Sequence, residues 1–166
     1  MSIVFVIIIL LLPIPLYAGF MSLFADRHRQ KIQAKLKDGF KRLITRHRLS
    51  IGEVNIFGNN LISMDRKMNK MVLVVYKNGI TWEKCIDLQE ILSCQVEKIF
   101  NRINSSIQRV NLDVIFHKEE TISFSFFDED ADDRHDLPSR IKKADYWKGK
   151  IRSRIGNVQL TNAAAI

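Results

Sequence analysis

The chain contains few of the residues that build common catalytic and metal sites. It has seven glycines, none of them clustered, which excludes a glycine-rich loop that cradles phosphate. Its two cysteines, Cys85 and Cys94, are too few for a disulfide framework or a zinc site. No G-x-S-x-G motif occurs, and the four histidines are scattered without metal-ligand spacing. The sequence therefore predicts a protein that is not an enzyme and that needs no metal or cofactor.

Charge is absent from the first 25 residues. No charged side chain lies between Met1 and Ala25, and the run from Ile3 to Leu12 is entirely apolar. A helix rises about 1.5 Å per residue, and some 20 residues therefore span the ~30 Å hydrocarbon core of a bilayer. We predict a transmembrane anchor over residues 1–25.

Positive charge is concentrated directly after this segment. Nine basic side chains stand against Asp26 and Asp38 there, so most of the net charge of +8 belongs to this stretch and does not mark the chain as nucleic-acid binding. Basic residues just after a span favour the cytoplasmic side, so we expect the amino terminus outside and the bulk of the chain in the cytoplasm. The nine candidate contacts for an anionic leaflet are Arg27, Arg29, Lys31, Lys35, Lys37, Lys41, Arg42, Arg46 and Arg48.

Two alternatives to the anchor stay open. Cleavage after Ala18 would make the chain an exported protein, although the segment lacks a positive start and has Leu16 where signal peptides prefer a small residue. Pro13 and Pro15 weaken helix hydrogen bonding and could mark a re-entrant turn. We favour the anchor, because no basic residue precedes the apolar run.

Residues 26–49 are predicted to form a basic amphipathic helix beside the membrane. Gly39 weakens this helix at its midpoint. The apolar stripe consists of Ile32, Leu36, Phe40, Leu43 and Ile44. Such a stripe can lie on an anionic leaflet, or it can pack on the domain that follows or on a second copy of itself. The sequence leaves both arrangements open.

From Gly52 the apolar residues alternate with polar ones, which indicates six or seven antiparallel strands with one buried face. Asn78-Gly79 is a strong hairpin signal, and residues 109–116 and 121–126 form the clearest pair of strands. The alternation places Cys85 with the polar residues and Cys94 with the apolar ones. We therefore expect both to be reduced and to lie on opposite sides of the sheet.

A closing helix follows the acidic loop Asp128–Asp136. It is expected from about Pro138 to Ile155, with Gly156 just past its end and residues 157–166 as a flexible tail. Its apolar stripe consists of Ile141, Ala144, Trp147, Ile151 and Ile155. The expected fold class is α+β, a bent sheet or partly open barrel closed by a carboxy-terminal helix, with residues 50–156 as one domain.

This order of elements resembles the pleckstrin-homology-like fold, in which a tryptophan of the closing helix packs against the strands. Trp147 would be that residue. The whole chain is similar to uncharacterised bacterial single-pass membrane proteins that carry such a domain, with Ile86-Asp87-Leu88 before a short turn and Ala144 and Trp147 in the helix. The resemblance implies no activity.

Two binding sites of related folds are incomplete in this sequence. The loop with Arg66, Lys67 and Lys70 lacks the arginine that the inositol-lipid motif of pleckstrin-homology domains requires. The acidic loop has Asp133 where a calcium loop needs glycine and Ser139 where it needs a bidentate glutamate. We expect neither ligand to bind.

The sequence therefore predicts a membrane-anchored, non-enzymatic interaction or scaffolding protein. It would present its domain at the inner leaflet to a protein partner or to a second copy, without a nucleic acid or small-molecule substrate. One alternative is a peripheral module that senses anionic lipid through its basic helix. The other is an exported protein with a cleaved signal peptide.

Overall fold

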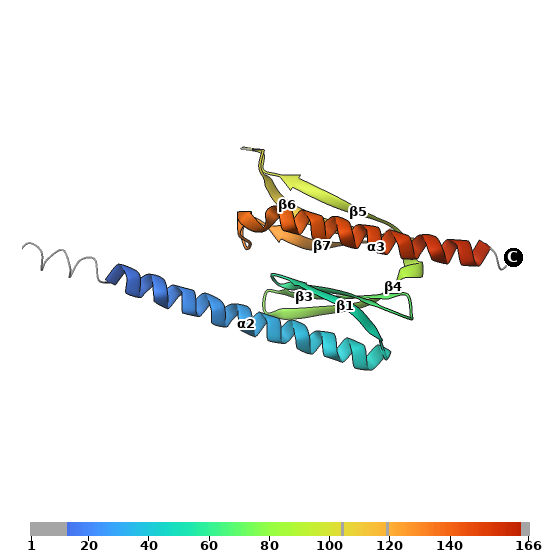
Figure 1. Ribbon diagram of the computed structural model, residues 1–166, viewed down its shortest axis with the longest axis horizontal. Coiled ribbons are helices and arrows are strands. Elements are labelled where there is room, and N and C mark those ends of the chain that lie inside the picture. Colours follow the sequence, from blue (N-terminus) through green and yellow to red (C-terminus); the bar gives the residue numbers. More distant parts are fainter. Residues whose placement is uncertain (1–12, 104, 119, 164–166) are drawn as a thin grey trace, which may run out of the picture.

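The computed structural model describes residues 13–103, 105–118 and 120–163, with helix side chains only between Arg27 and Ile155. Its elements are, in order, α2 (Pro13–His47), β1 (Ile51–Phe57), β2 (Asn60–Asp65), β3 (Lys70–Lys77), β4 (Ile80–Asp87), the 3-10 helix η1 (Leu88–Glu90), β5 (Ile91–Phe100), β6 (Ile107–Phe116), β7 (Thr121–Asp128), the 3-10 helix η2 (Arg134–Asp136) and α3 (Leu137–Ala163) (Figure 1). The predicted α+β class, with antiparallel strands and a carboxy-terminal helix, is confirmed.

The prediction of a single bent sheet or partial barrel is wrong. The strands form two antiparallel sheets, β1-β2-β3-β4 (sheet A) and β5-β6-β7 (sheet B), and neither sheet closes. The chain leaves sheet A through η1, where the Asp87 side chain accepts a hydrogen bond from the Gln89 N–H and caps this short helix. This turn redirects the chain, so β5 pairs with β6 and does not pair with β4.

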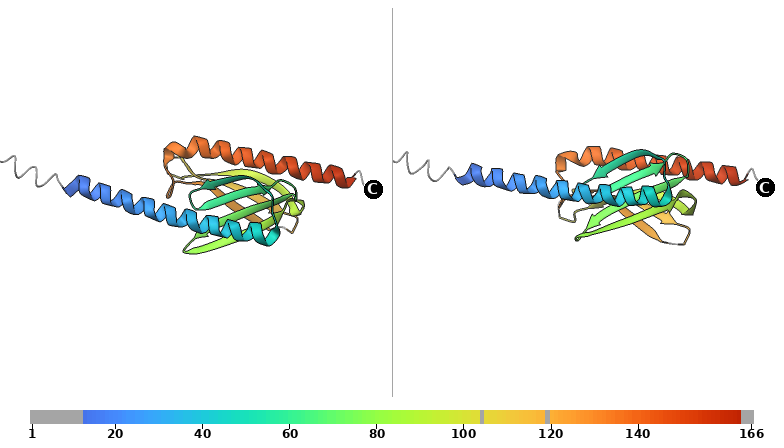
Figure 2. Two further views of the ribbon diagram at one scale, coloured as in Figure 1. Left: turned by 60° about the horizontal axis from the view of Figure 1, so that its bottom comes forward. Right: turned by 90° about the horizontal axis from the view of Figure 1, so that it is seen from below.

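Sheet A is buried on both faces (Figures 1 and 2). One face packs on α2, and the other faces sheet B and α3. The strand period of two explains this, because neighbouring residues of β2 and β3 point to opposite sides. The face toward α2 carries Leu61, Val72 and Val74, whereas the face toward sheet B carries Ile62, Met64, Met71, Leu73 and Ile86.

Helix α2 is continuous, and its carboxyl half packs on sheet A. Ile32, Leu36 and Leu43 are buried against this sheet, with Phe40 partly buried beside them. Of the two arrangements that the sequence left open for the apolar stripe, packing on the domain that follows is therefore observed. Within the described residues, no helix is both long enough and apolar enough to cross a membrane. Residues 1–12 of the predicted anchor lie outside the described residues, so the anchor stays a prediction.

The end of α2 is fixed by a Schellman arrangement. Arg48 adopts a left-handed conformation (φ 51°), and the Leu49 N–H donates to the Ile44 carbonyl over 3.1 Å. Leu49 itself is buried in the cluster beneath α2. The helix therefore stops at His47, two residues before the predicted limit, and turns directly into β1.

A buried carboxylate holds the chain just after this turn. Asp65, at the end of β2, is 1% exposed and accepts hydrogen bonds from the backbone N–H groups of Ser50, Lys67 and Met68. Burial alone would raise the pKa of Asp65, but these N–H donors outweigh it and hold the pKa below its ordinary value. The Arg66 N–H also donates to the Ser50 carbonyl (2.8 Å). The end of α2 is thereby tied to the β2–β3 loop.

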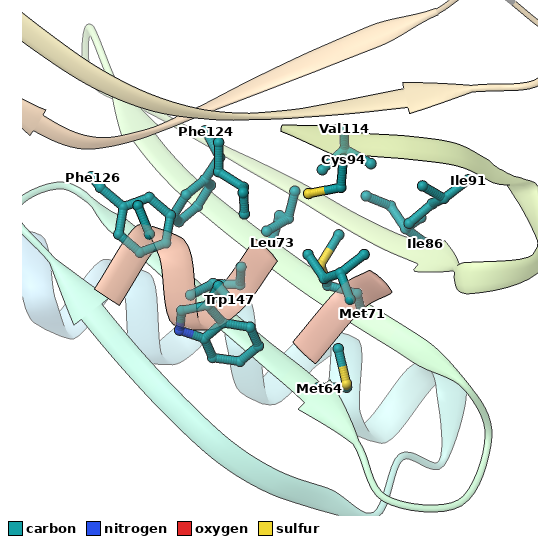
Figure 3. Close-up of a cluster of buried hydrophobic side chains, with 14 of the residues drawn as sticks. Met64, Met71, Leu73, Ile86, Ile91, Cys94, Val114, Phe124, Phe126 and Trp147 are labelled. Carbon is teal, nitrogen blue, oxygen red and sulfur yellow. The ribbon is translucent and has the colours of Figure 1, made fainter. Parts of the chain in front are cut away.

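Helix α3 is longer than predicted. It begins at Leu137, as expected, but it continues past Gly156 to Ala163, so the tail expected from residue 157 is largely helical. A single glycine inside a helix costs only about 1 kcal/mol and does not by itself end it. The expectation that Trp147 packs against the strands is confirmed, since its side chain projects from α3 and is fully buried in the core between the two sheets (Figure 3).

Gly39 allows α2 to lie close to sheet A. A Cβ atom at this position would lie 3.0 Å from Glu83 Oε1 and 3.1 Å from both Thr81 Cγ2 and Val74 Cγ1. The glycine that weakens the helix in isolation therefore permits the contact with β3 and β4. Gly149 in α3 has no such neighbour, since a Cβ there would meet nothing within 4 Å.

We predict opposite effects for substitutions at these two helical glycines. Gly149→Ala should raise the free energy of unfolding by about 0.5–1 kcal/mol through helix propensity alone. Gly39→Ala should raise the free energy of unfolding by less than Gly149→Ala does. Gly39→Leu should lower it by about 1–3 kcal/mol, because the larger side chain overpacks the contact with sheet A. Chemical denaturation of the variants measures these differences. A Gly39→Leu variant as stable as the wild type would show that α2 does not pack closely on the sheet.

Candidate functional site

The basic surface of α2 is the feature that the sequence marked for function. All nine of its predicted contact residues are exposed. Two of them are engaged by the sheet: Lys35 Nζ donates to the Tyr76 hydroxyl over 3.3 Å and lies 4.8 Å from the ring centroid, and Arg42 forms an ion pair with Glu83. These two basic residues help hold α2 on sheet A, a role that the sequence did not indicate.

The other seven have no side-chain partner among the described residues. They are Arg27, Arg29, Lys31, Lys37, Lys41, Arg46 and Arg48. At 1.5 Å per residue the positions from Arg27 to Arg46 extend over roughly 30 Å of helix, so they form a long strip and not a compact site. Lys41, Arg42, Thr45 and Arg46 line a shallow, open depression on this strip. Its shape suits contact with an extended anionic surface better than enclosure of a small molecule.

The second basic group lies at the far end of the domain. Arg66 and Lys67 belong to the β2–β3 loop, and Lys70 is the first residue of β3. This loop is bonded to Ser50 just after the carboxyl end of α2. The structure therefore brings this loop close to Arg48 and not to Arg27. The two basic groups that the sequence suggested for lipid contact cannot meet one flat surface at the amino-terminal end of α2.

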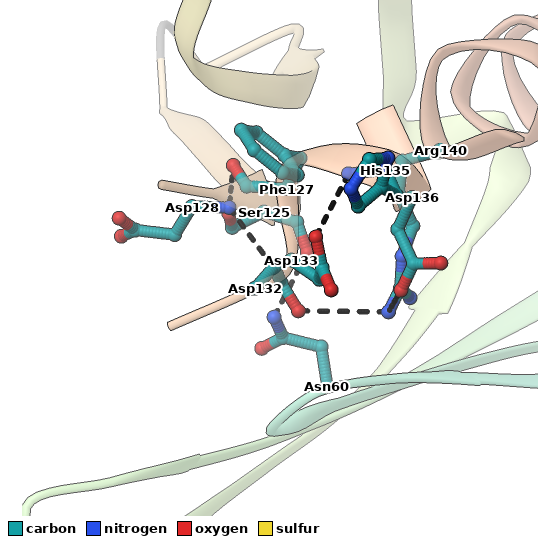
Figure 4. Close-up of polar contacts among 9 residues, drawn as sticks. All are labelled: Asn60, Ser125, Phe127, Asp128, Asp132, Asp133, His135, Asp136 and Arg140. Carbon is teal, nitrogen blue, oxygen red and sulfur yellow. Dashed lines mark hydrogen bonds and ion pairs between the residues drawn. The ribbon is translucent and has the colours of Figure 1, made fainter. Parts of the chain in front are cut away.

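The acidic loop is a structural turn whose carboxylates are bonded within the domain (Figure 4). Asp133 caps η2 by accepting from the His135 N–H, and Asp132 accepts from the Asp128 N–H over 3.0 Å. Arg140 lies 3.5 Å from Asp132 and 3.4 Å from Asp136. Among the described residues, no group of three or more His, Cys, Asp or Glu side chains has the geometry of a metal site.

Both cysteines are free thiols, and they lie in different sheets and not on opposite sides of one sheet, with Cys85 on β4 and Cys94 on β5. Cys94 belongs to the core between the sheets, and Cys85 packs beside the cluster beneath α2. Burial raises the pKa of the Cys94 thiol to about 12. Cys94 is therefore protonated at neutral pH, and its thiolate is not available as a nucleophile.

Helix α3 covers one open side between the two sheets. Arg152 Nε donates to the Cys94 carbonyl on β5 over 3.0 Å. On β1, Glu53 Oε2 accepts from the Tyr146 hydroxyl (2.6 Å) and from Lys150 Nζ (2.7 Å). These contacts hold α3 against both sheets.

The four outer strands, β1, β4, β5 and β7, each pair with a strand on one side only. Side chains of α3 contact β1 and β5, and Asn60 Nδ2 donates to the Ser125 carbonyl on β7 over 2.8 Å.

Several exposed apolar side chains form a surface that the sequence analysis missed. Ile80, Trp82 and Phe100 lie at strand ends and were assigned to buried faces by alternation, but they are all exposed, as is Ile103 in the β5–β6 turn. The only signal that could have found them is their position next to turns, where a strand runs past the core that would cover it.

Comparisons with protein-family models, with curated protein sequences and with solved structures found no match for this chain.

We predict that the contact between Glu53 and α3 makes the free energy of unfolding fall at acidic pH. The hydrogen bonds from Lys150 and Tyr146 lower the pKa of Glu53 from 4.5 to about 2. A depressed carboxyl pKa contributes stability that is present above pH 4.5 and is lost as the pH falls toward 2. Because Glu53 is 37% exposed, solvent screens the pair and the effect should be at most about 1 kcal/mol.

Denaturation curves measured across this pH range give the test. Glu53→Gln should remove this part of the pH dependence, and Glu97→Gln on β5, where the described residues offer no partner, should leave it unchanged. If the free energy of unfolding depends on pH equally in the wild type and in Glu53→Gln, Glu53 is not the source of the acid sensitivity.

Proposed function

We propose that the protein is a single-pass membrane protein without catalytic activity, which presents its α+β domain at the inner leaflet to another protein or to a second copy. In this proposal the domain is pleckstrin-homology-like, as the order of its elements suggests. The supporting observation is that α2 runs unbroken from Pro13 to His47 and packs on sheet A. A membrane segment at the start of this helix would hold the domain in a fixed orientation.

The continuity of α2 limits how its basic residues can act. If the bilayer core ends near Ala25, the helix carries Arg46 about 30 Å farther along its axis at 1.5 Å per residue. Charges beyond a Debye length of about 8 Å from the headgroups are largely screened. Only the first basic residues, Arg27 and Arg29 with Lys31, would then hold the helix at the leaflet. The remaining strip would face the cytoplasm and is open to a negatively charged partner.

The outer edge of β4 and the first half of β7 are the second feature that favours a protein partner, since each pairs with a strand on one side only and Asn60 donates to β7 at the Ser125 carbonyl, farther along the strand. An extended peptide can add to such an edge through backbone hydrogen bonds, without a deep pocket. β7 exposes Thr121 and Ser123, which are small enough to allow a strand to approach. In this proposal the partner docks at these strand edges.

The partnerless basic strip supports a second candidate, a peripheral module that senses anionic lipid. In that case α2 would lie flat on the leaflet along its length, with each basic residue near the surface contributing about 1 kcal/mol. A helix whose start crosses the bilayer cannot also lie flat along it. The two candidates therefore predict opposite results in one experiment.

We predict that the full-length chain stays in the membrane pellet after washing with high salt and with alkaline carbonate. An integral anchor is held by apolar side chains, which salt does not release, whereas a peripheral helix is held by charge. Lys41→Gln with Arg46→Gln should leave retention unchanged. Release of the wild-type chain by carbonate, or a native amino terminus at Gly19 in mass spectrometry, would contradict the anchor.

The partner is tested in the same membranes. A photo-crosslinking residue in place of Ser123 on β7 should capture a protein, and the same residue in place of Lys142, on the exposed side of α3, is the matched control. A chain that stays monomeric in mild detergent and gives no cross-link from Ser123 would contradict the proposal.

A further inference from the structure

Four of the exposed large apolar side chains among the described residues lie at one end of the domain. They are Ile103 (95% exposed), Ile80 (71%), Phe100 (56%) and Trp82 (42%). Ile80 and Trp82 begin β4 just after the β3–β4 hairpin, while Phe100 ends β5 and Ile103 lies in the turn that follows. A cluster of apolar groups on hairpin tips indicates a contact surface, since solvated loops rarely gather them.

This end of the domain is the end at which α2 enters. Toward its amino terminus, α2 contacts sheet A nearer the β3–β4 hairpin. Arg42 pairs with Glu83, whereas Gly39 and Lys35 contact Thr81 and Tyr76, which pair with each other closer to the turn. The β1–β2 turn meets the end of β3 through the bond from the Tyr76 N–H to the Asn59 carbonyl. The four apolar residues are therefore on the amino-terminal side of the domain.

The tip of sheet B lies toward the same end. Phe57, the last residue of β1, stacks on Phe126 near the end of β7, with ring centroids 4.6 Å apart. The end of β7 pairs with the start of β6, and Ile107 there pairs with Phe100. The two ribbon views agree, because the β3–β4 hairpin and the start of α3 point toward the amino-terminal end of α2 (Figure 2).

The length of exposed helix sets how far this surface lies from the uncharged segment. Among the side chains of α2 that the structure describes, from Arg27 onward, Ile32 is the first that is buried, and residues 27–31 are all exposed. From Ala25 to Ile32 the helix rises roughly 10 Å at 1.5 Å per residue. The headgroup layer on each side of a bilayer core is about 5–8 Å thick. A core that ends near Ala25 therefore brings the headgroups to this end of the domain.

We propose that this end is a membrane-contact face, on which Ile80, Trp82, Phe100 and Ile103 enter the interfacial layer of the bilayer that holds the amino-terminal segment. The inference rests on the proposed anchor. Tryptophan is enriched at this depth, because its ring is apolar and its N–H is polar. Lys77, Lys98 and Arg102 are exposed beside these residues and have no side-chain partner within the described ranges, so they can contact lipid phosphates.

The acidic loop lies toward the same end, and several of its carboxylates are paired with arginine. Asp128 is held by Arg109 over 3.1 Å, Glu129 by Arg134, and Asp132 by Arg140. Its remaining carboxylates would repel an anionic leaflet. The face should therefore tilt, with the β3–β4 and β5–β6 tips closer to the lipid than the start of α3.

Fluorescence quenching by brominated lipid tests this contact in the full-length chain. The protein is reconstituted in vesicles of phosphatidylcholine and phosphatidylglycerol, with bromine near the headgroup end of the acyl chains. The chain has two tryptophans, and Trp147 is fully buried in the core, so the quenched emission reports Trp82. We expect a loss of the Trp82 emission on brominated lipid, and no such loss in Trp82→Phe.

Paired variants define the face. Ile80→Asp with Ile103→Asp should reduce the quenching of Trp82, whereas Leu92→Asp, an exposed apolar position at the other end of β5, should not. Carbonate-resistant insertion is measured on the same vesicles. A chain that does not insert contradicts the anchor itself. A chain that inserts without quenching of Trp82 overturns the membrane-contact face and leaves the anchor standing. The same holds if the Trp82 emission changes with the amount of protein per vesicle and not with bromination of the lipid.

Discussion

The packing of α2 on sheet A is the contact on which the rest of the structure depends. Burial of an aliphatic side chain contributes about 1.5–3 kcal/mol, so Ile32, Leu36 and Leu43 together supply an upper estimate of roughly 5–9 kcal/mol. That is comparable to the whole stability of an ordinary domain. The helix is therefore part of the fold and not an attachment to it. Gly39 lowers the helix propensity of α2 but lets its backbone lie close to sheet A, which makes this contact possible.

The same packing fixes how the domain is oriented relative to the segment that precedes it. Sheet A is covered by α2 on one face and by sheet B with α3 on the other (Figure 1). The orientation of the two sheets relative to the start of α2 is therefore fixed. An anchor at that point would decide which hairpin tips meet lipid and which loops face the cytoplasm. The β2–β3 loop with Arg66 and Lys67, tied to the far end of α2 by Asp65, would be among the parts farthest from the bilayer.

Local patterns in the sequence predicted much of this fold. The hairpin at Asn78-Gly79 is present with positive φ at both residues, and the stripe from Ala144 to Ile155 is buried as expected. Periodicity and turn chemistry are local properties, and they are read directly from neighbouring residues. The division into two sheets was not predictable in this way, because it depends on which strands pair across η1. Alternation also could not show that Trp82 and Phe100 run past the core.

The basic surface was predicted as a set of residues but not as an arrangement. All nine side chains are exposed, yet Lys35 and Arg42 bind the sheet, and the others lie along a helix too long to meet one surface at its end. Charge composition shows how many cations a segment has. Only the partners of each residue, and the direction of the helix that carries them, show which cations are available to a ligand.

Hydrogen exchange of the full-length chain in lipid nanodiscs tests the packing of α2 most directly. If this helix is part of the domain, the amides from Leu36 to Leu43 will open with the same free energy as those of β3, from Met71 to Val74, because neither can unfold without the other. If the α2 amides exchange much faster while β3 stays protected, the helix is detachable. The fixed orientation of the domain would then be contradicted.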